Sequence, residues 1–155
     1  MKAVVGFGAN VGDRLATMRA ALRALRRVAR VDATSHVYET APVGPPQPDY
    51  LNAAALLEWE GPPEALLAEL LAIEASLGRV RDGERFGPRA IDLDVLWIEH
   101  VALRTPRLTV PHPRLKERAF ALAPMLEVAP RAAEPHTGTP YVVPAGDVRG
   151  TADVL

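Results

Sequence analysis

The sequence predicts an α+β protein built on an antiparallel sheet. Apolar runs that are typical of strands outnumber helical segments in the first half of the chain. The second and third of these runs follow one another with no helix between them, which favours antiparallel pairing. The resulting order, β-α-β-β-α-β, is the ferredoxin-like split βαβ pattern. We therefore expect helices packed mainly on one face of the sheet and a functional site on the other.

The predicted core strands are short apolar runs bounded by turn residues. They are Ala3 to Phe7, Ala33 to Thr40, Leu51 to Trp59 and Ala90 to Ile98. Between the second and third of them, residues 41–49 contain four prolines. This segment is too stiff for regular structure and long enough to form a binding loop.

Two helices are predicted between these strands. The first follows Asp13 and has apolar residues at helical spacing from Leu15 to Ala29, with arginines on its remaining surface. The second runs from about Glu64 to Leu77, after two prolines and before Gly78. Its buried stripe is predicted to comprise Leu66, Leu70, Ile73 and Leu77, widened by Leu67 and Leu71.

The rest of the chain carries weaker signals. Val101 to Leu103 is expected to pair back across the turn at residues 99–100, and a third helix is expected from about Leu115 to Leu126. The proline-rich tail from Glu127 predicts loops with one short strand. With 155 residues and neither a repeat nor a linker, the chain is expected to form one domain spanning residues 1–155.

Composition excludes several classes of protein. The net charge of −1 gives no overall attraction to nucleic acid or to an anionic membrane. The absence of cysteine excludes disulfides and thiolate metal sites, which leaves oxygen or imidazole ligands for any metal. No apolar run approaches the roughly 20 residues of a membrane span. We expect a cytoplasmic protein without a nucleic-acid or membrane partner.

The segment GRVRDGERFGPRAIDLD, residues 78–94, carries the clearest functional signal. Asp92 and Asp94 lie two apart in a predicted strand, so their side chains share a face, with Cα atoms roughly 6.6 Å apart. Two such carboxylates repel each other unless cations compensate, and magnesium suits a pair of carboxylates together with phosphate and water. The opposite face is predicted to comprise Ile91, Leu93, Val95 and Trp97. Four arginines that can surround an anion precede the pair, namely Arg79, Arg81, Arg85 and Arg89. Together these residues predict a site for a metal-bound polyphosphate.

Some of these residues have plainer interpretations. The two aspartates could simply pair with arginines at a sheet edge, and Glu74 could be an ordinary ion-pair partner rather than part of a ligand site. His112 could be a loop histidine that caps a backbone group. The spacing Gly6-x-Gly8-x-x-x-Gly12 resembles a loose dinucleotide-binding turn, although Val11 stands where the fingerprint has glycine. The rival functions are therefore a dinucleotide-dependent reductase and a non-catalytic interaction module.

Several motifs in order resemble one enzyme family. They are G-x-N near the start, T-x-P-x-G followed by P-D-Y-L-N, E-x-x-x-G-R-x-R, R-x-G-P-R-x-x-D-x-D, and R-L-x-x-P-H ahead of R-x-F. From about Gly8 to Pro130 the chain is similar to the 6-hydroxymethyl-7,8-dihydropterin pyrophosphokinases, which transfer pyrophosphate from ATP to a pterin alcohol in folate biosynthesis. The resemblance implies a monomer with a ferredoxin-like α+β fold, with ATP as co-substrate and two magnesium ions.

The resemblance also implies roles for individual residues. Asp92 and Asp94 would bind the metal ions and, with Arg79 and Arg89, form the catalytic set. The implied nucleotide-binding residues are Glu74, Arg79, Arg81, Arg89, Arg107, Thr109, His112 and Arg118. The implied pterin-binding residues are Asn10, Thr40, Pro42, Val43, Tyr50, Asn52, Phe86, Asp92 and Phe120. The chain departs from the family at Phe86, Leu71 and Pro113, where tryptophan, glutamine and an aromatic or basic residue are common.

Overall fold

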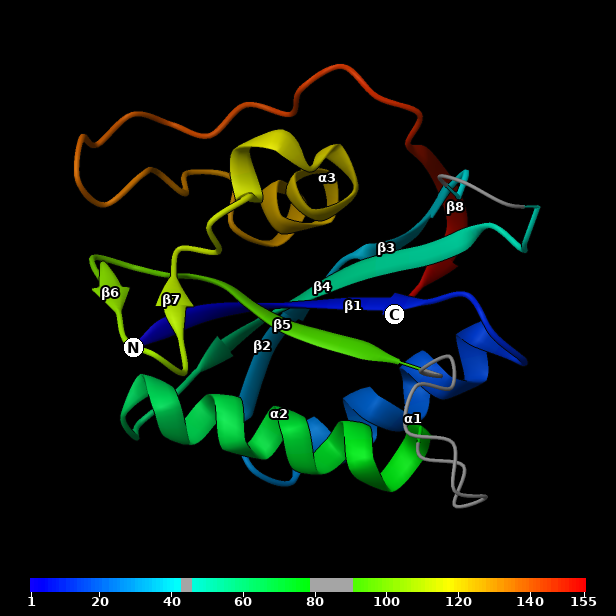
Figure 1. Ribbon diagram of the computed structural model, residues 1–155, viewed down its shortest axis with the longest axis horizontal. Helices are drawn as coiled ribbons and strands as arrows, with labels where there is room; N and C mark the ends of the chain where they lie inside the picture. Colours follow the sequence, from blue (N-terminus) through cyan, green and yellow to red (C-terminus); the bar gives the residue numbers. More distant parts are fainter. Residues whose placement is uncertain (43–45, 79–90) are drawn as a thin grey trace.

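A six-stranded antiparallel sheet forms the centre of the molecule in the computed structural model, which describes residues 1–42, 46–78 and 91–155 (Figure 1). Its strands lie in the order β5-β1-β4-β3-β8, and β2 also pairs with β4. Their bounds are Lys2–Ala9 (β1), Arg30–Thr34 (β2), His36–Thr40 (β3), Tyr50–Glu58 (β4), Asp92–Ile98 (β5) and Arg149–Val154 (β8). The antiparallel α+β sheet is as predicted, and the ferredoxin-like description of its core stays a prediction.

The predicted second strand is divided by Ser35. The Ser35 side chain is fully buried, and its hydroxyl accepts a hydrogen bond from the Ala54 N–H of β4 at 2.8 Å. The Ser35 N–H in turn donates to the Ala54 carbonyl at 2.9 Å. A serine that bonds the neighbouring backbone in this way competes with the regular ladder, so β2 and β3 form as two segments.

Helices cover both faces of the sheet (Figure 1). On one face α1 (Arg14–Arg26) and α2 (Pro63–Gly78) pack over a core that includes Val5, Phe7, Leu57 and Leu66. On the other face α3 (Ala119–Val128) packs against Val4, Ala54 and Leu96. The expectation of one open face is therefore wrong over this part of the sheet. The reason is that α3 is apolar around most of its circumference, with six of its ten residues buried.

The helices begin and end close to their predicted positions. The Asp13 carboxylate caps α1 by accepting the Ala16 N–H at 3.1 Å. In α2 the predicted stripe is confirmed at Leu66, Leu70 and Ile73, which are buried. Leu71 does not widen the stripe, because it lies one step further around the helix and is 46% exposed.

Strand β5 contains a bulge that changes the direction of its last side chains. Val95 pairs with Val5 and Trp97 pairs with Val4, so Leu96 is an extra residue between them. Ile91, Leu93 and Val95 face the α1/α2 core as predicted. Trp97 does not join them; it faces α3 and donates its Nε1–H to the Ala133 carbonyl at 3.0 Å.

The segment after β5 differs from its prediction. The pair β6 (Leu103–Arg104) and β7 (Thr109–Val110) form their own ladder, so residues 101–103 do not pair back onto β5. The predicted third helix is divided into a 3₁₀ turn, Leu115–Glu117, and α3. The tail supplies β8, which extends the sheet beside β3. Among the described residues no helix is both long and apolar enough to cross a membrane.

Glu127 at the end of α3 ties this helix to β3. Its carboxylate accepts hydrogen bonds from the His36 N–H at 3.0 Å and from the Tyr38 hydroxyl at 2.8 Å, and it lies 2.8 Å from His36 Nδ1. Burial alone would raise the pKa of Glu127, but these hydrogen bonds outweigh it and hold the pKa below its ordinary value of 4.5. Because the folded-state pKa is the lower one, this stabilisation is present above pH 4.5 and is lost as the pH falls through the folded-state pKa.

We predict that Glu127→Gln lowers the free energy of unfolding at pH 7 by about 1–2 kcal/mol, since the carboxylate is partly exposed. This corresponds to roughly 2–8 °C in thermal midpoint for a chain of this size. Thermal unfolding at pH 7 and again well below the pH at which Glu127 protonates checks the prediction, and the difference should shrink in acid. The matched control is Glu117→Gln, which removes the exposed ion pair with Arg114. An equal loss at both pH values would show that the charge of Glu127 is irrelevant.

Candidate functional site

Two rows of paired residues cross the sheet at the start of β5. In one row Asp92 pairs with Gly8, which pairs with Asn52 on β4. In the other row Asp94 pairs with Gly6. Direct cross-strand partners share a face, so Asp92, Gly8 and Asn52 lie on the same side of the sheet. Asp92 and Asp94 are both exposed while the residues next to them are buried, which confirms that the two carboxylates share a face.

Both positions of β1 that pair with these aspartates are glycines. A Cβ atom at Gly8 would lie 3.4 Å from Asn52 Oδ1, and one at Gly6 would lie 3.0 Å from the Leu96 side chain. Both glycines lie inside β1, and both neighbours of β1 are antiparallel to it. A dinucleotide fingerprint needs a turn within a parallel βαβ unit, so this alternative does not fit the structure.

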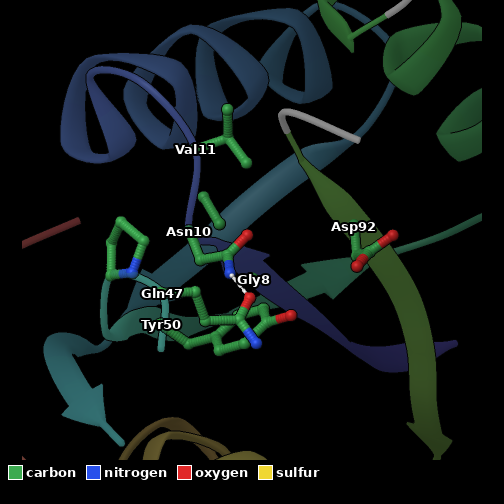
Figure 2. Close-up of a pocket in the computed structure, with 8 residues that line it drawn as sticks. Gly8, Asn10, Val11, Gln47, Tyr50 and Asp92 are labelled. Carbon is green, nitrogen blue, oxygen red and sulfur yellow. Dashed lines mark hydrogen bonds between the residues drawn. The ribbon is translucent and has the colours of Figure 1, made fainter. Parts of the chain in front are cut away.

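A cavity of about 380 Å³ opens next to Asp92. This volume lies in the usual range for small-molecule sites. Asn10 donates its Nδ2–H to Gln47 Oε1 at 2.8 Å, and Asp92 faces the pair from β5 across the cavity (Figure 2). The residues that line it are Gly8, Ala9, Asn10, Val11, Gln47, Pro48, Tyr50 and Asp92. Three predicted substrate-binding residues, Asn10, Tyr50 and Asp92, are thus brought together.

Thr40 and Asn52 form a buried polar pair behind this cavity. They are 8% and 6% exposed, and Asn52 donates its Nδ2–H to Thr40 Oγ1 at 3.0 Å. The side-chain amide oxygen of Asn52, Oδ1, is the atom nearest to the position of a Gly8 Cβ, so it faces β1 and the row that contains Asp92. A fixed amide of this kind can hydrogen-bond the edge of a flat heterocycle.

His112 lies close to the second aspartate. Its N–H donates to the Leu96 carbonyl of β5 at 2.9 Å, and its Nδ1 accepts the Arg114 N–H at 3.2 Å. Burial lowers the pKa of His112, with smaller effects from Arg118 and Arg114 in the same direction and an opposing one from Asp94. In the neutral ring with Nδ1 accepting, Nε2 carries the proton and can donate to an anion. The backbone-capping interpretation is therefore correct for Nδ1, and it leaves Nε2 for a ligand.

Glu74 of α2 supports the strand that carries the aspartates. Its Oε2 accepts the Leu93 N–H at 2.8 Å, and Leu93 lies between Asp92 and Asp94 in the chain. The two sequence interpretations, an ion-pair partner and a ligand residue, did not include this backbone contact. Glu74 thereby helps to fix the position of both carboxylates.

The other predicted residues that the structure describes lie outside the cavity lining. Arg118 stacks over the Phe120 ring, 5.5 Å from its centroid, at the start of α3. Thr109 lies on β7, and Arg107 is exposed in the turn before it. Pro42 follows Thr40 and is half-buried. None of these five residues lines the cavity described above.

Part of the predicted site lies outside the described residues. These predictions concern Val43, Arg79, Arg81, Arg85, Phe86 and Arg89.

Sequence reasoning missed Gln47 as a cavity residue. Gln47 is the only glutamine in the chain and lies in the proline-rich segment that was expected to form a binding loop. A single amide side chain among prolines was the sequence signal that could have identified Gln47 as a ligand-binding residue. Gly8, Ala9, Val11 and Pro48 also line the cavity without having been predicted.

An α+β fold with a ligand-sized cavity lined by an exposed aspartate is typical of an enzyme that acts on a small molecule. The family model described as 7,8-dihydro-6-hydroxymethylpterin-pyrophosphokinase matches residues 4–130. The chain belongs to this family, whose members transfer pyrophosphate from ATP to 6-hydroxymethyl-7,8-dihydropterin in folate biosynthesis.

Individual relatives agree with this assignment. The chain is 42% identical to the 2-amino-4-hydroxy-6-hydroxymethyldihydropteridine pyrophosphokinase of Synechocystis sp., over 88% of this chain and 70% of the relative. It is 44% identical to the enzyme of that name from Methylorubrum extorquens, over 83% of each chain. Its fold resembles the HPPK-DHPS crystal structure from Plasmodium falciparum, with a TM-score of 0.70 at 13% identity. The match covers 90% of this chain and 44% of that one, and at this identity it concerns the fold alone.

Proposed function

We propose that the chain, acting as a single domain over residues 1–155, transfers the pyrophosphoryl group of ATP to the hydroxymethyl oxygen of the reduced pterin. One observation carries the proposal. Asp92 belongs both to the wall of the cavity and to the pair of carboxylates, so a substrate in the cavity would lie next to the place where a polyphosphate is neutralised. The cytoplasmic location and the monomeric state stay predictions.

In the proposed reaction the hydroxymethyl oxygen forms a bond with the β-phosphorus of ATP. The bond between that phosphorus and the oxygen bridging to the α-phosphate breaks, AMP leaves, and the hydroxyl loses its proton. Phosphoryl transfer of this kind needs positioning and charge neutralisation more than a protein nucleophile. Asp92 is the carboxylate on the side of the substrate and is our candidate to orient the hydroxyl group.

The residues present fit magnesium. Asp92 and Asp94 offer oxygen ligands on one exposed face, and both of their paired positions on β1 are glycines, which add no side chain of their own beside the carboxylates. Among the described residues no group of three or more acidic or histidine side chains could enclose a metal ion. A site with two carboxylates and room for water and phosphate is what magnesium requires. Asp92 and Asp94 would hold the two ions, which supply charge neutralisation to the phosphates when bound.

We propose that ATP binds on the Asp94 side of the site. His112 offers an Nε2–H donor there, and Arg118 lies close enough to act on the His112 pKa. Glu74 would act through β5, which it anchors. The remaining proposed nucleotide residues are Arg79, Arg81, Arg89, Arg107 and Thr109.

We propose that the pterin occupies the cavity. Asn10, Gln47 and Tyr50 would contact the pterin at the cavity wall. Asn52, next to Gly8, would offer its side-chain Oδ1 as a hydrogen-bond acceptor. The other proposed substrate residues are Thr40, Pro42, Val43, Phe86 and Phe120.

The reaction products test this proposal. Incubating the protein with magnesium, ATP and 6-hydroxymethyl-7,8-dihydropterin should yield AMP in an amount equal to the pterin consumed. Nucleotides can be separated by anion-exchange chromatography, and omission of the pterin should abolish AMP formation. Release of ADP, or no consumption of ATP, would contradict the proposed function.

His112→Gln should weaken ATP binding with little change in pterin binding. A hydrogen bond to a charged group contributes about 1.5–3 kcal/mol, so we expect the KM for ATP to rise about tenfold or more. Initial-rate kinetics at saturating pterin measure this change. The matched control is His100→Gln, because the His100 side chain is 90% exposed in the turn after β5. An unchanged KM for ATP in His112→Gln would remove this residue from the nucleotide site.

A further inference from the structure

The C-terminal strand, β8, lies outside the segment that matches the family model. It pairs with β3 at the edge of the sheet. Arg149 of β8 pairs with Glu39 of β3, the residue before Thr40. The Thr151 hydroxyl donates to the Val37 carbonyl at 2.7 Å, and the Leu155 N–H donates to the Ser35 carbonyl at 3.0 Å. These contacts fix β8 beside β3, whose last residue, Thr40, pairs with the cavity residue Tyr50.

From this position Arg149 reaches the segment that forms one wall of the cavity. Its Nη2 donates to Asp49 Oδ2 at 2.8 Å, and Arg14 of α1 donates to the Asp49 carbonyl oxygen at 2.6 Å. Two residues earlier, Gln47 is bonded to Asn10. The short run 47–49 is therefore attached to Asn10 just after β1, to α1 and to β8 before the chain enters β4 at Tyr50.

The charges around Arg149 increase its effect on this segment. Its Nε also lies 3.6 Å from Asp147 Oδ1, and the nearby acidic groups, chiefly Asp49, raise the Arg149 pKa, with Glu39 adding to the effect. Arg149 is thus surrounded by three carboxylates. Without its charge, Asp49 would face Asp147 and Glu39 with no cation from β8 between them, so like-charge repulsion would act on the wall segment.

We propose that Arg149 is a positioning residue, which holds residues 47–49 through Asp49 and so keeps the substrate cavity in its binding shape. The C-terminal strand thereby acts on substrate affinity although it contributes no residue to the cavity lining. The structural part of this proposal is independent of the reaction, whereas its effect on pterin affinity rests on the proposed function.

Hydrogen exchange tests the structural part on the unliganded full-length protein. Arg149→Met should increase the exchange rate of the Gln47, Asp49 and Tyr50 amides about two- to fivefold, the range for an exposed ion pair. Asp49→Asn should have a smaller effect, because the asparagine amide oxygen can still accept the Arg149 hydrogen bond and the substitution creates no like-charge repulsion on the wall segment. Arg149→Lys should restore most of the protection.

Two controls separate this effect from general loosening. Asp153→Asn changes a charge on the same strand, and Arg131→Met removes an exposed arginine from the tail. Neither substitution should change the exchange rates of the Gln47, Asp49 and Tyr50 amides. The double variant Asp49→Asn/Arg149→Met should exchange more slowly than the sum of the two single effects predicts. Strict additivity, or unchanged exchange in Arg149→Met, would overturn the proposal.

Direct binding tests the functional part. With 6-hydroxymethyl-7,8-dihydropterin as the probe, calorimetry should give a Kd about two- to fivefold higher for Arg149→Met than for the unmodified protein, with the Kd for ATP unchanged. If the unmodified protein binds and converts the pterin, and Arg149→Met has the same Kd for pterin, this inference alone is overturned. Absence of pterin binding in the unmodified protein would instead overturn the proposed function, while the exchange experiment would still decide whether Arg149 fixes the wall segment.

Discussion

Asp94→Asn should reduce the turnover number on the order of 10²- to 10³-fold, by analogy with the loss of one preorganised electrostatic group from an active site. Asparagine keeps the size of the side chain but removes the charge. Because Asp94 is on the exposed face of β5, the substitution changes the charge of the site without disturbing the core. Steady-state AMP formation at saturating ATP and pterin measures the loss, and a magnesium titration should show that more metal is needed.

The same substitution should leave the thermal midpoint unchanged or slightly higher. Two like charges on one face of a strand repel each other in the absence of a cation, so removing one relieves that repulsion. Loss of activity with retained stability separates a role in the reaction from a role in folding. Arg27→Ala, at the exposed residue that follows α1, is the control and should change neither quantity. Full activity in Asp94→Asn would exclude Asp94 from the metal site.

Asn52→Leu should weaken pterin binding about 10- to 100-fold while ATP affinity is kept. The substitution removes an amide that is buried and fixed by Thr40, so both the bond to the substrate and the partner of the Thr40 hydroxyl are lost. A missing partner for a buried polar group costs about 1–3 kcal/mol, which sets the expected range. Calorimetric titration with the reduced pterin and, separately, with magnesium ATP measures the two affinities.

A control is needed because Asn52→Leu also alters the protein interior. Thr34→Val removes a hydroxyl that bonds the Leu155 carbonyl at 3.2 Å, away from the cavity, and should not change pterin affinity. Circular dichroism of Asn52→Leu should show the native spectrum. If the well-folded variant bound pterin as tightly as the unmodified protein, the substrate would have to occupy a different place.

The side-chain direction of the aspartates could be predicted because it depends only on the strand period. Asp92 and Asp94 share a face in any regular strand, and the structure confirms this. The direction of Trp97 could not be predicted in the same way, because the extra residue in β5 reverses the alternation after Val95. Ser35 is a similar case, since its effect depends on a hydrogen bond to a strand that is distant in sequence.

The face of the sheet that the third helix covers could not be predicted from the spacing of its apolar residues. A helix with a single apolar stripe indicates one buried face, but α3 is buried on most of its surface and so gives no direction. The strand in the tail was equally difficult to place, because β8 is mostly exposed and its position depends on β3. Edge strands of this kind carry little hydrophobic signal.

The candidate site could be predicted where a residue belongs to a motif and not where it depends on loop geometry. Asn10, Tyr50 and Asp92 were named from their motifs, and the structure brings them to one cavity. Gln47 lines the same cavity, where its side chain accepts a hydrogen bond from Asn10. No sequence period predicts such a contact.

The contact between Glu74 and Leu93 has a consequence for the behaviour of the protein in concentrated solution. In the described sheet β5 is an outer strand, and an apolar outer strand with unpaired backbone groups is a template for another chain. Glu74 occupies the Leu93 N–H, and the His112 N–H occupies the Leu96 carbonyl. The residues that orient the strand with the two aspartates therefore also cap part of its outward backbone, and we expect these two contacts to disfavour edge-to-edge aggregation.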